Sequence, residues 1–127
     1  MKNISSFTAI TIFAFGTFAH SSGFAETVEV QIIKSVFYPY VVKIKKGDTI
    51  RWINRDGLLH TVASGKAPIH DGHFKGSYVL KEYKTPINQT GVIDYFCELH
   101  NGTMRGVIVA EKVGESPESL LEEPPKP

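Results

Sequence analysis

Apolar and polar positions alternate along most of the chain, and a period of two is typical of β-strands with one buried face. Segments of this kind end at turn-forming residues, and one weaker region contains a proline that favours a sheet edge. The predicted strands cover residues 27–33, 41–45, 49–53, 60–63, 92–97 and 104–110, with the weaker region at 78–87. No window shows the periodicity of an amphipathic helix. We therefore expect an all-β fold, a Greek-key β-sandwich or barrel of seven or eight strands.

Residues 64–76 interrupt this pattern, because they are rich in Gly, Pro, Asp and His. We expect a long connection without regular structure here. His70 and His73 lie within it, three positions apart. They could form a metal site or a metal-acquiring loop, or they could simply keep the loop soluble. The lack of a third ligand type at a fixed spacing favours solubility.

The first 25 residues have the pattern of a secretory signal peptide. Lys2 precedes an apolar stretch over residues 7–19, which is too short to span a bilayer, and small residues lead to a plausible cleavage site after Ala25. An uncleaved membrane anchor is the alternative, and the short apolar stretch disfavours it. We expect export to the periplasm and no stable membrane insertion.

The remaining composition describes one small domain with a tail. The 127-residue chain has a formal charge of +1, which gives no support for nucleic-acid binding. Residues 26–110 contain 11 basic and 8 acidic side chains, a net charge of +3, whereas the end of the chain is acidic and rich in proline. The predicted organisation is a domain over residues 26–112 and a disordered tail over residues 113–127.

Cys97 is the single cysteine, so an internal disulfide is excluded. An unpaired thiol in an oxidising compartment needs protection or a use. Cys97, His100 and Met104 form a Cys-x-x-His-x-x-x-Met motif between the last two predicted strands, and His60 begins another strand. Each residue alone is ordinarily a packing or polar residue. Together they supply the two imidazoles, thiolate and weak axial thioether of a blue-copper centre.

Two segments carry a resemblance to a known family. Residues 37–62 resemble the first half of a small cupredoxin, a type 1 blue copper protein, and residues 95–109 resemble its copper-ligand loop. The similarity is amicyanin- or plastocyanin-like, particularly over residues 48–55 and 104–106, and it covers residues 28–110.

The resemblance implies a site and a role. His60, Cys97 and His100 would be equatorial ligands and Met104 the axial ligand of one copper ion that cycles between Cu(II) and Cu(I). The implied role is one-electron transfer between larger redox proteins in the periplasm, without enzymatic activity.

The chain departs from the family pattern at two places. Amicyanins have two residues between the loop His and Met, and plastocyanins have four, whereas this chain has three. This difference in loop length affects the expected distance between the Met104 sulfur and the copper ion. Thr61 stands where many members have Asn, and its hydroxyl is expected to take part of that residue's role in joining the two ligand loops.

Leu58 and Leu59 precede His60 in a loop, where exposed leucines favour a docking surface. By the resemblance, this apolar patch near His100 would receive redox partner proteins, and the protein would work as a monomer. Lys66 and Arg105 either rim the patch or simply solvate outward strand faces.

Two other functions compete with electron transfer. One is a copper-binding module for delivery or storage, with His70 and His73 added to the same ligands. The other is a thiol enzyme in which His100 activates Cys97, although the sequence offers no clear oxyanion hole or substrate cleft.

Overall fold

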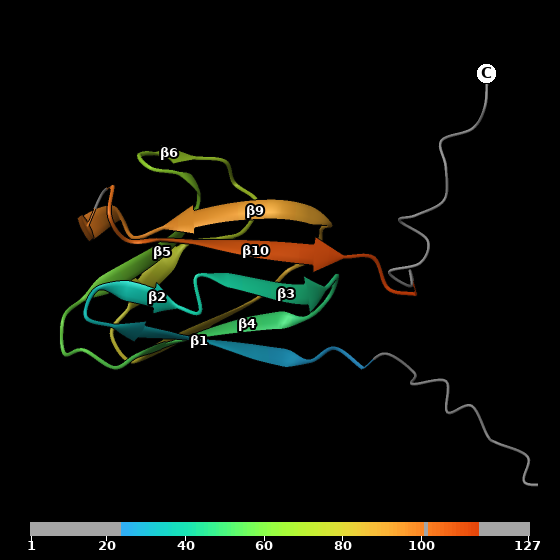
Figure 1. The fold of residues 1–127 in the computed structure, drawn as a ribbon, viewed down its shortest axis with the longest axis horizontal. Coiled ribbons are helices and arrows are strands. Elements are labelled where there is room, and N and C mark those ends of the chain that lie inside the picture. Colours follow the sequence, from blue (N-terminus) through green and yellow to red (C-terminus); the bar gives the residue numbers. More distant parts are fainter. Residues whose placement is uncertain (1–23, 101, 115–127) are drawn as a thin grey trace, which may run out of the picture.

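The computed structural model describes residues 24–100 and 102–114 (Figure 1). Nearly all of the predicted signal peptide and tail therefore lie outside the described residues. No helix in the described part is long and apolar enough to cross a membrane. That part contains ten strands and one 3-10 turn: β1 (Thr27–Ile33), β2 (Val36–Tyr38), β3 (Val41–Lys45), β4 (Thr49–Asn54), β5 (His60–Lys66), β6 (Ile69–His70), β7 (Ser77–Val79), β8 (Glu82–Pro86), β9 (Gly91–Phe96), η1 (Glu98–His100) and β10 (Arg105–Glu111).

The strands form two sheets that lie face to face (Figure 1). One sheet has the order β2-β1-β4-β8, and the other has the order β3-β10-β9-β5-β6, with β7 paired to β5. Two pairs, β1 with β4 and β3 with β10, are parallel, and the others are antiparallel. The predicted all-β sandwich is confirmed. The structure has more strands than the sequence predicts because β2, β6 and β7 contain only two or three residues each, too few for a visible alternation.

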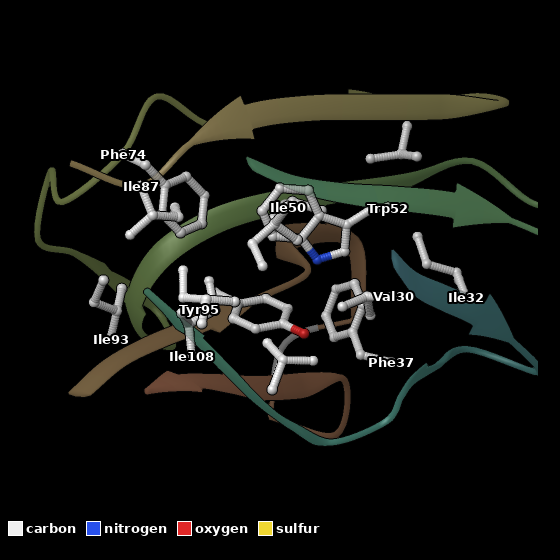
Figure 2. Close-up of a cluster of buried hydrophobic side chains, with 14 of the residues drawn as sticks. Val30, Ile32, Phe37, Ile50, Trp52, Phe74, Ile87, Ile93, Tyr95 and Ile108 are labelled. Carbon is white, nitrogen blue, oxygen red and sulfur yellow. The ribbon is translucent and has the colours of Figure 1, made fainter. Parts of the chain in front are cut away.

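The core fills the space between the sheets, and aromatic rings meet at its centre (Figure 2). The Trp52 ring lies 5.5 Å from that of Phe74 and 5.6 Å from that of Tyr95. Burial raises the pKa of Tyr95 far above its ordinary value, so the phenol stays protonated. A Cβ at Gly106 would lie only 2.7 Å from Cε1 of Tyr95, so β10 needs a glycine where it crosses this ring. Cys97 belongs to the same buried cluster.

Residues 64–76 are more regular than the sequence predicts. Strand β5 continues to Lys66 and turns back into β6, with Gly65 opposite His70. Gly65 has a φ of +128°, and a Cβ there would collide with the Ile69 carbonyl, so glycine permits this hairpin. The His70 ring lies 5.4 Å from that of Phe96, on the outer side of β9. The prediction of an irregular connection is wrong for this part.

The predicted ligands gather at one end of the sandwich. Strand β9 runs toward Cys97, and β5 begins at His60 beside it. Figure 1 shows η1 and the β4–β5 connection at this end, while the start of β1 and the end of β10 lie at the opposite end. The sandwich thus provides one end for chemistry and keeps the chain's entry and exit away from it.

Candidate metal centre

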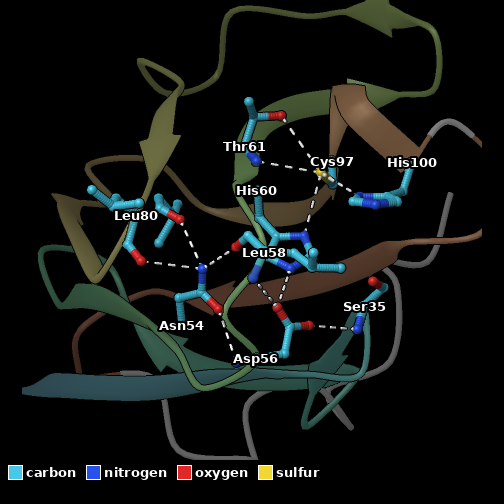
Figure 3. A network of polar contacts seen from close by, with 10 residues as sticks. Ser35, Asn54, Asp56, Leu58, His60, Thr61, Leu80, Cys97 and His100 are labelled. Atoms are coloured by element: carbon cyan, nitrogen blue, oxygen red, sulfur yellow. Dashed lines mark hydrogen bonds and ion pairs between the residues drawn. The ribbon is translucent and has the colours of Figure 1, made fainter.

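Three side chains from two separate segments converge at this end (Figure 3). The Cys97 Sγ lies 3.4 Å from Nδ1 of His100 and 3.9 Å from Nδ1 of His60. One ligand atom from each residue can be chosen so that all three lie within 4.8 Å of one another. Among residues 24–100 and 102–114, no other set of three or more His, Cys, Asp or Glu residues meets this condition.

The backbone explains why these side chains meet. Antiparallel pairing of β5 with β9 places Ala63 opposite Phe96, so the residue after β9 reaches the first residues of β5. After Cys97 the chain forms η1, and the His100 N–H donates to the Cys97 carbonyl at 3.3 Å. This single turn brings the His100 imidazole back over the strand end.

Met104 closes the loop that begins at Cys97. The Cys97 N–H donates to the Met104 carbonyl at 3.0 Å, and the Met104 N–H donates to the His100 carbonyl at 3.3 Å. The three-residue spacing is accommodated by a turn that includes Gly102, whose φ is +93°. Met104 is 1% exposed and packs in the same buried cluster as Cys97.

Burial divides the three ligand residues into two kinds. His60 and Cys97 are fully buried, whereas His100 is only partly buried. A thiolate with two imidazoles is a donor set that suits copper in both oxidation states. A buried thiol of this kind is also inaccessible to a substrate, which argues against the thiol-enzyme hypothesis.

Thr61 joins the two ligand segments. Its N–H donates to Cys97 Sγ at 3.3 Å, and its hydroxyl oxygen accepts the Glu98 N–H at 2.7 Å. The hydroxyl also lies 3.8 Å from Cys97 Sγ. The sequence-based expectation that Thr61 ties the ligand loops agrees with these contacts.

Asn54 and Asp56 are part of the site, and the sequence analysis missed them. The Asn54 side-chain amide donates to the Leu58 carbonyl at 2.6 Å and to the Val79 carbonyl at 3.0 Å, which joins the β4–β5 and β7–β8 connections. Asp56 Oδ1 lies 2.7 Å from Nε2 of His60. In the sequence analysis, Asn54 and Asp56 were interpreted only as turn-forming residues. The four-residue spacing between Asp56 and His60 was the one sequence feature that could have indicated their contact.

His70 and His73 do not join the centre. His70 Nε2 lies 2.9 Å from a Glu98 carboxylate oxygen, and His73 Nε2 lies 3.6 Å from one of Asp71. Both histidines are exposed. These pairs support the solubility interpretation of the histidine loop over a second metal site.

Exposed leucines surround the ligand end of the sandwich. Leu59 is 43% exposed and directly precedes His60, while Leu99 is 51% exposed and directly precedes His100. Leu58 and Leu80 are also exposed, and their carbonyls share the Asn54 amide. We call these four residues the leucine patch. Leu80 and Leu99 were not predicted as members, because each is isolated in the sequence.

The chain is similar to known copper proteins. Residues 25–111 match the family described as copper binding proteins, plastocyanin/azurin family. Amicyanin from Paracoccus versutus is 35% identical over 89 residues, which cover 68% of this chain and 67% of that protein. Plastocyanin from Scenedesmus fuscus is 30% identical over 87 residues, 60% of this chain and 87% of that protein. The crystal structure of the Paracoccus versutus amicyanin superposes with a TM-score of 0.58 at 33% identity, covering 67% of this chain and 81% of that one.

Replacing Thr61 tests the connection between the ligand segments. Thr61→Val leaves the part-buried Glu98 N–H without its acceptor, and loss of such a hydrogen bond costs about 1 kcal/mol. We expect the copper-free Val variant to lose stability in denaturant unfolding, while Thr61→Ser, which keeps the hydroxyl, retains most of it. Equal stability of the Val and Ser variants would contradict this role.

Proposed function

Because the chain belongs to the plastocyanin/azurin family of copper-binding proteins, we propose that it carries single electrons between larger redox proteins outside the cytoplasm. It is a type 1 copper protein and an electron carrier, and it is not an enzyme. The observation that carries the proposal is the convergence of a buried thiol with two imidazoles from separate segments.

The proposed ligands are His60, Cys97 and His100 in the equatorial plane and Met104 in the axial position. Copper bound there would supply the one-electron redox chemistry. The protein's part is to hold the donors in place. Strand pairing, the η1 turn and the Thr61 hydrogen bonds all fix backbone close to the ligands, so little rearrangement is needed when the charge changes.

The electron is proposed to leave through His100. His60 and Cys97 are fully buried, so the partly exposed His100 is the ligand nearest to solvent. Leu99 of the leucine patch directly precedes it, and the exposed leucines offer an apolar surface on which a redox partner can dock. We assign this docking role to the protein as a monomer.

Export belongs to the proposal as well. The support is the sequence pattern of residues 1–25, with a basic start, a short apolar stretch and small residues before Ala25. Removal after Ala25 would leave a mature chain that begins at Glu26, one residue before β1. The copper-bound thiolate then explains how an unpaired cysteine persists in an oxidising compartment.

Copper delivery or storage is less well supported. That function would gain from His70 and His73 as extra ligands, but these residues pair with Glu98 and Asp71 instead. A site meant to release its metal would also be expected to expose its ligands, whereas His60 and Cys97 are inaccessible.

A visible spectrum tests the proposed function. After addition of Cu(II) to residues 26–127, we expect a strong thiolate-to-copper charge-transfer band that disappears reversibly on reduction. Cys97→Ser should abolish the band, because the thiolate is its electron source. A colourless protein that holds only Cu(I) and passes it to an acceptor would instead support copper delivery.

Met104→Leu tests the axial ligand. Leucine has a similar volume, so the buried site should stay packed and copper should remain bound. Loss of the weak thioether donor should disfavour Cu(II) and raise the reduction potential, measured by voltammetry. Loss of all copper binding, or an unchanged potential, would contradict an axial role.

The leucine patch is tested by electron self-exchange between Cu(I) and Cu(II) copies, measured by NMR line broadening. Leu59→Lys puts a charge into the contact, and a barrier increase of about 1.4 kcal/mol would slow exchange about tenfold. The control is Val92→Lys, an equally charged change at an exposed position at the start of β9, away from Cys97. Equal rates in the two variants would argue against docking through the patch.

A further inference from the structure

The Asp56 carboxylate lies next to the buried His60 ring, on the side away from Cys97 (Figure 3). Asp56 Oδ1 is 2.7 Å from Nε2 of His60, on the other side of the ring from Nδ1, which faces Cys97 Sγ at 3.9 Å. The His60 side chain is fully buried and that of Asp56 is 15% exposed, so water screens this contact poorly. An ionised carboxylate accepts hydrogen bonds and donates none, so this contact favours the His60 tautomer with its hydrogen on Nε2 and a free lone pair on Nδ1.

The carboxylate itself is held from other directions. Its Oδ2 accepts the Ser35 N–H at 2.8 Å, and its Oδ1 accepts the Leu58 N–H at 3.2 Å. Both oxygens of the Asp56 side chain therefore act as acceptors, as those of an ionised carboxylate do. These bonds hold the carboxylate in place beside His60.

The Ser35 contact links the site to a strained turn. Lys34 and Ser35, between β1 and β2, have φ values of 51° and 58°, in the left-handed region that non-glycine residues seldom occupy. This conformation costs free energy and is kept only where neighbouring contacts favour it. The bond from Ser35 to Asp56 is such a contact, and it joins the first hairpin to the β4–β5 connection.

We infer that Asp56 is a positioning residue for the copper site: it fixes the orientation and tautomer of His60 and strengthens Nδ1 as a donor. This inference rests on the proposed function. An anionic hydrogen-bond partner raises the basicity of a ligand imidazole. A stronger nitrogen donor favours Cu(II) over Cu(I), so Asp56 lowers the reduction potential.

Asp56→Asn tests this role with little change in shape. The asparagine side-chain oxygen can accept a hydrogen bond from His60 Nε2–H or from the Ser35 N–H. Its NH₂ group then faces the other donor, and that hydrogen bond is lost. We expect Cu(II) affinity to fall about 10- to 100-fold, as is typical when an outer-shell partner is lost. If Cu(I) affinity is unchanged, each tenfold loss raises the potential by about 59 mV. The charge-transfer band should persist.

Asp94→Asn is the matched control. It removes the same charge from β9, where Asp94 is half-exposed and lies 4.0 Å from Lys66 rather than against a ligand. Equal shifts of potential in the two variants, or no shift in Asp56→Asn, would overturn the inference, since a general charge effect would then suffice. A wild-type protein without a charge-transfer band would refute the proposed function instead.

A measurement without substitution covers the case in which Asp56→Asn fails to fold. In the diamagnetic Cu(I) protein, nitrogen-15 NMR should find the His60 hydrogen on Nε2 and protected from solvent exchange. An unprotonated Nε2, or a hydrogen that exchanges freely, would show that the Asp56 contact does not hold this tautomer.

Discussion

The pairing of β5 with β9 is the constraint on which the site depends. Strand β5 begins with His60 and β9 ends just before Cys97, so their register sets how far the imidazole lies from the thiol. Backbone hydrogen bonds hold this register, and both residues are buried among the rigid packing of the sandwich. His100 and Met104 then need only one turn and one strand start to complete the donor set.

The two histidines of the site differ in how firmly the surrounding protein holds them, so the site has a buried side and a solvent-facing side. His60 is enclosed by the core and braced by Asp56, while His100 belongs to a short loop with a solvent-facing side. Leu99 of the leucine patch lies in this loop, whereas Leu58 and Leu59 precede the buried His60. The buried part of the site therefore holds the geometry, and the solvent-facing part is where we propose that an electron partner gains access. Both properties arise from where β4 and β9 end and where β5 begins.

The sequence predicted the part of this arrangement that depends on local pattern. Alternation along β1, β4 and β10 identified an all-β sandwich, and the spacing of Cys97, His100 and Met104 predicted a metal-ligand loop, of which the structure brings Cys97 and His100 together. His60 was assigned from its place at a strand start together with the family resemblance.

The sequence pattern could not predict contacts between segments that are far apart in the chain. The Ser35 N–H that holds the Asp56 carboxylate comes from 21 residues away in the sequence, and no periodicity indicates such a contact. Likewise, Gly65 lay within the predicted irregular connection, because only the hairpin with β6 shows that β5 continues through it. Leu80 joins the leucine patch only through its contact with Asn54, which lies 26 residues away in the sequence.

The central claim is that the fold holds one thiolate and two imidazoles around copper in both oxidation states. X-ray absorption at the copper edge measures this directly, because it reports the number and kind of donors and their distances. The account predicts one short copper–sulfur distance and two copper–nitrogen distances, changing little between Cu(II) and Cu(I). A spectrum without the short sulfur donor, or one in which most of the ligand set is replaced on reduction, would contradict it.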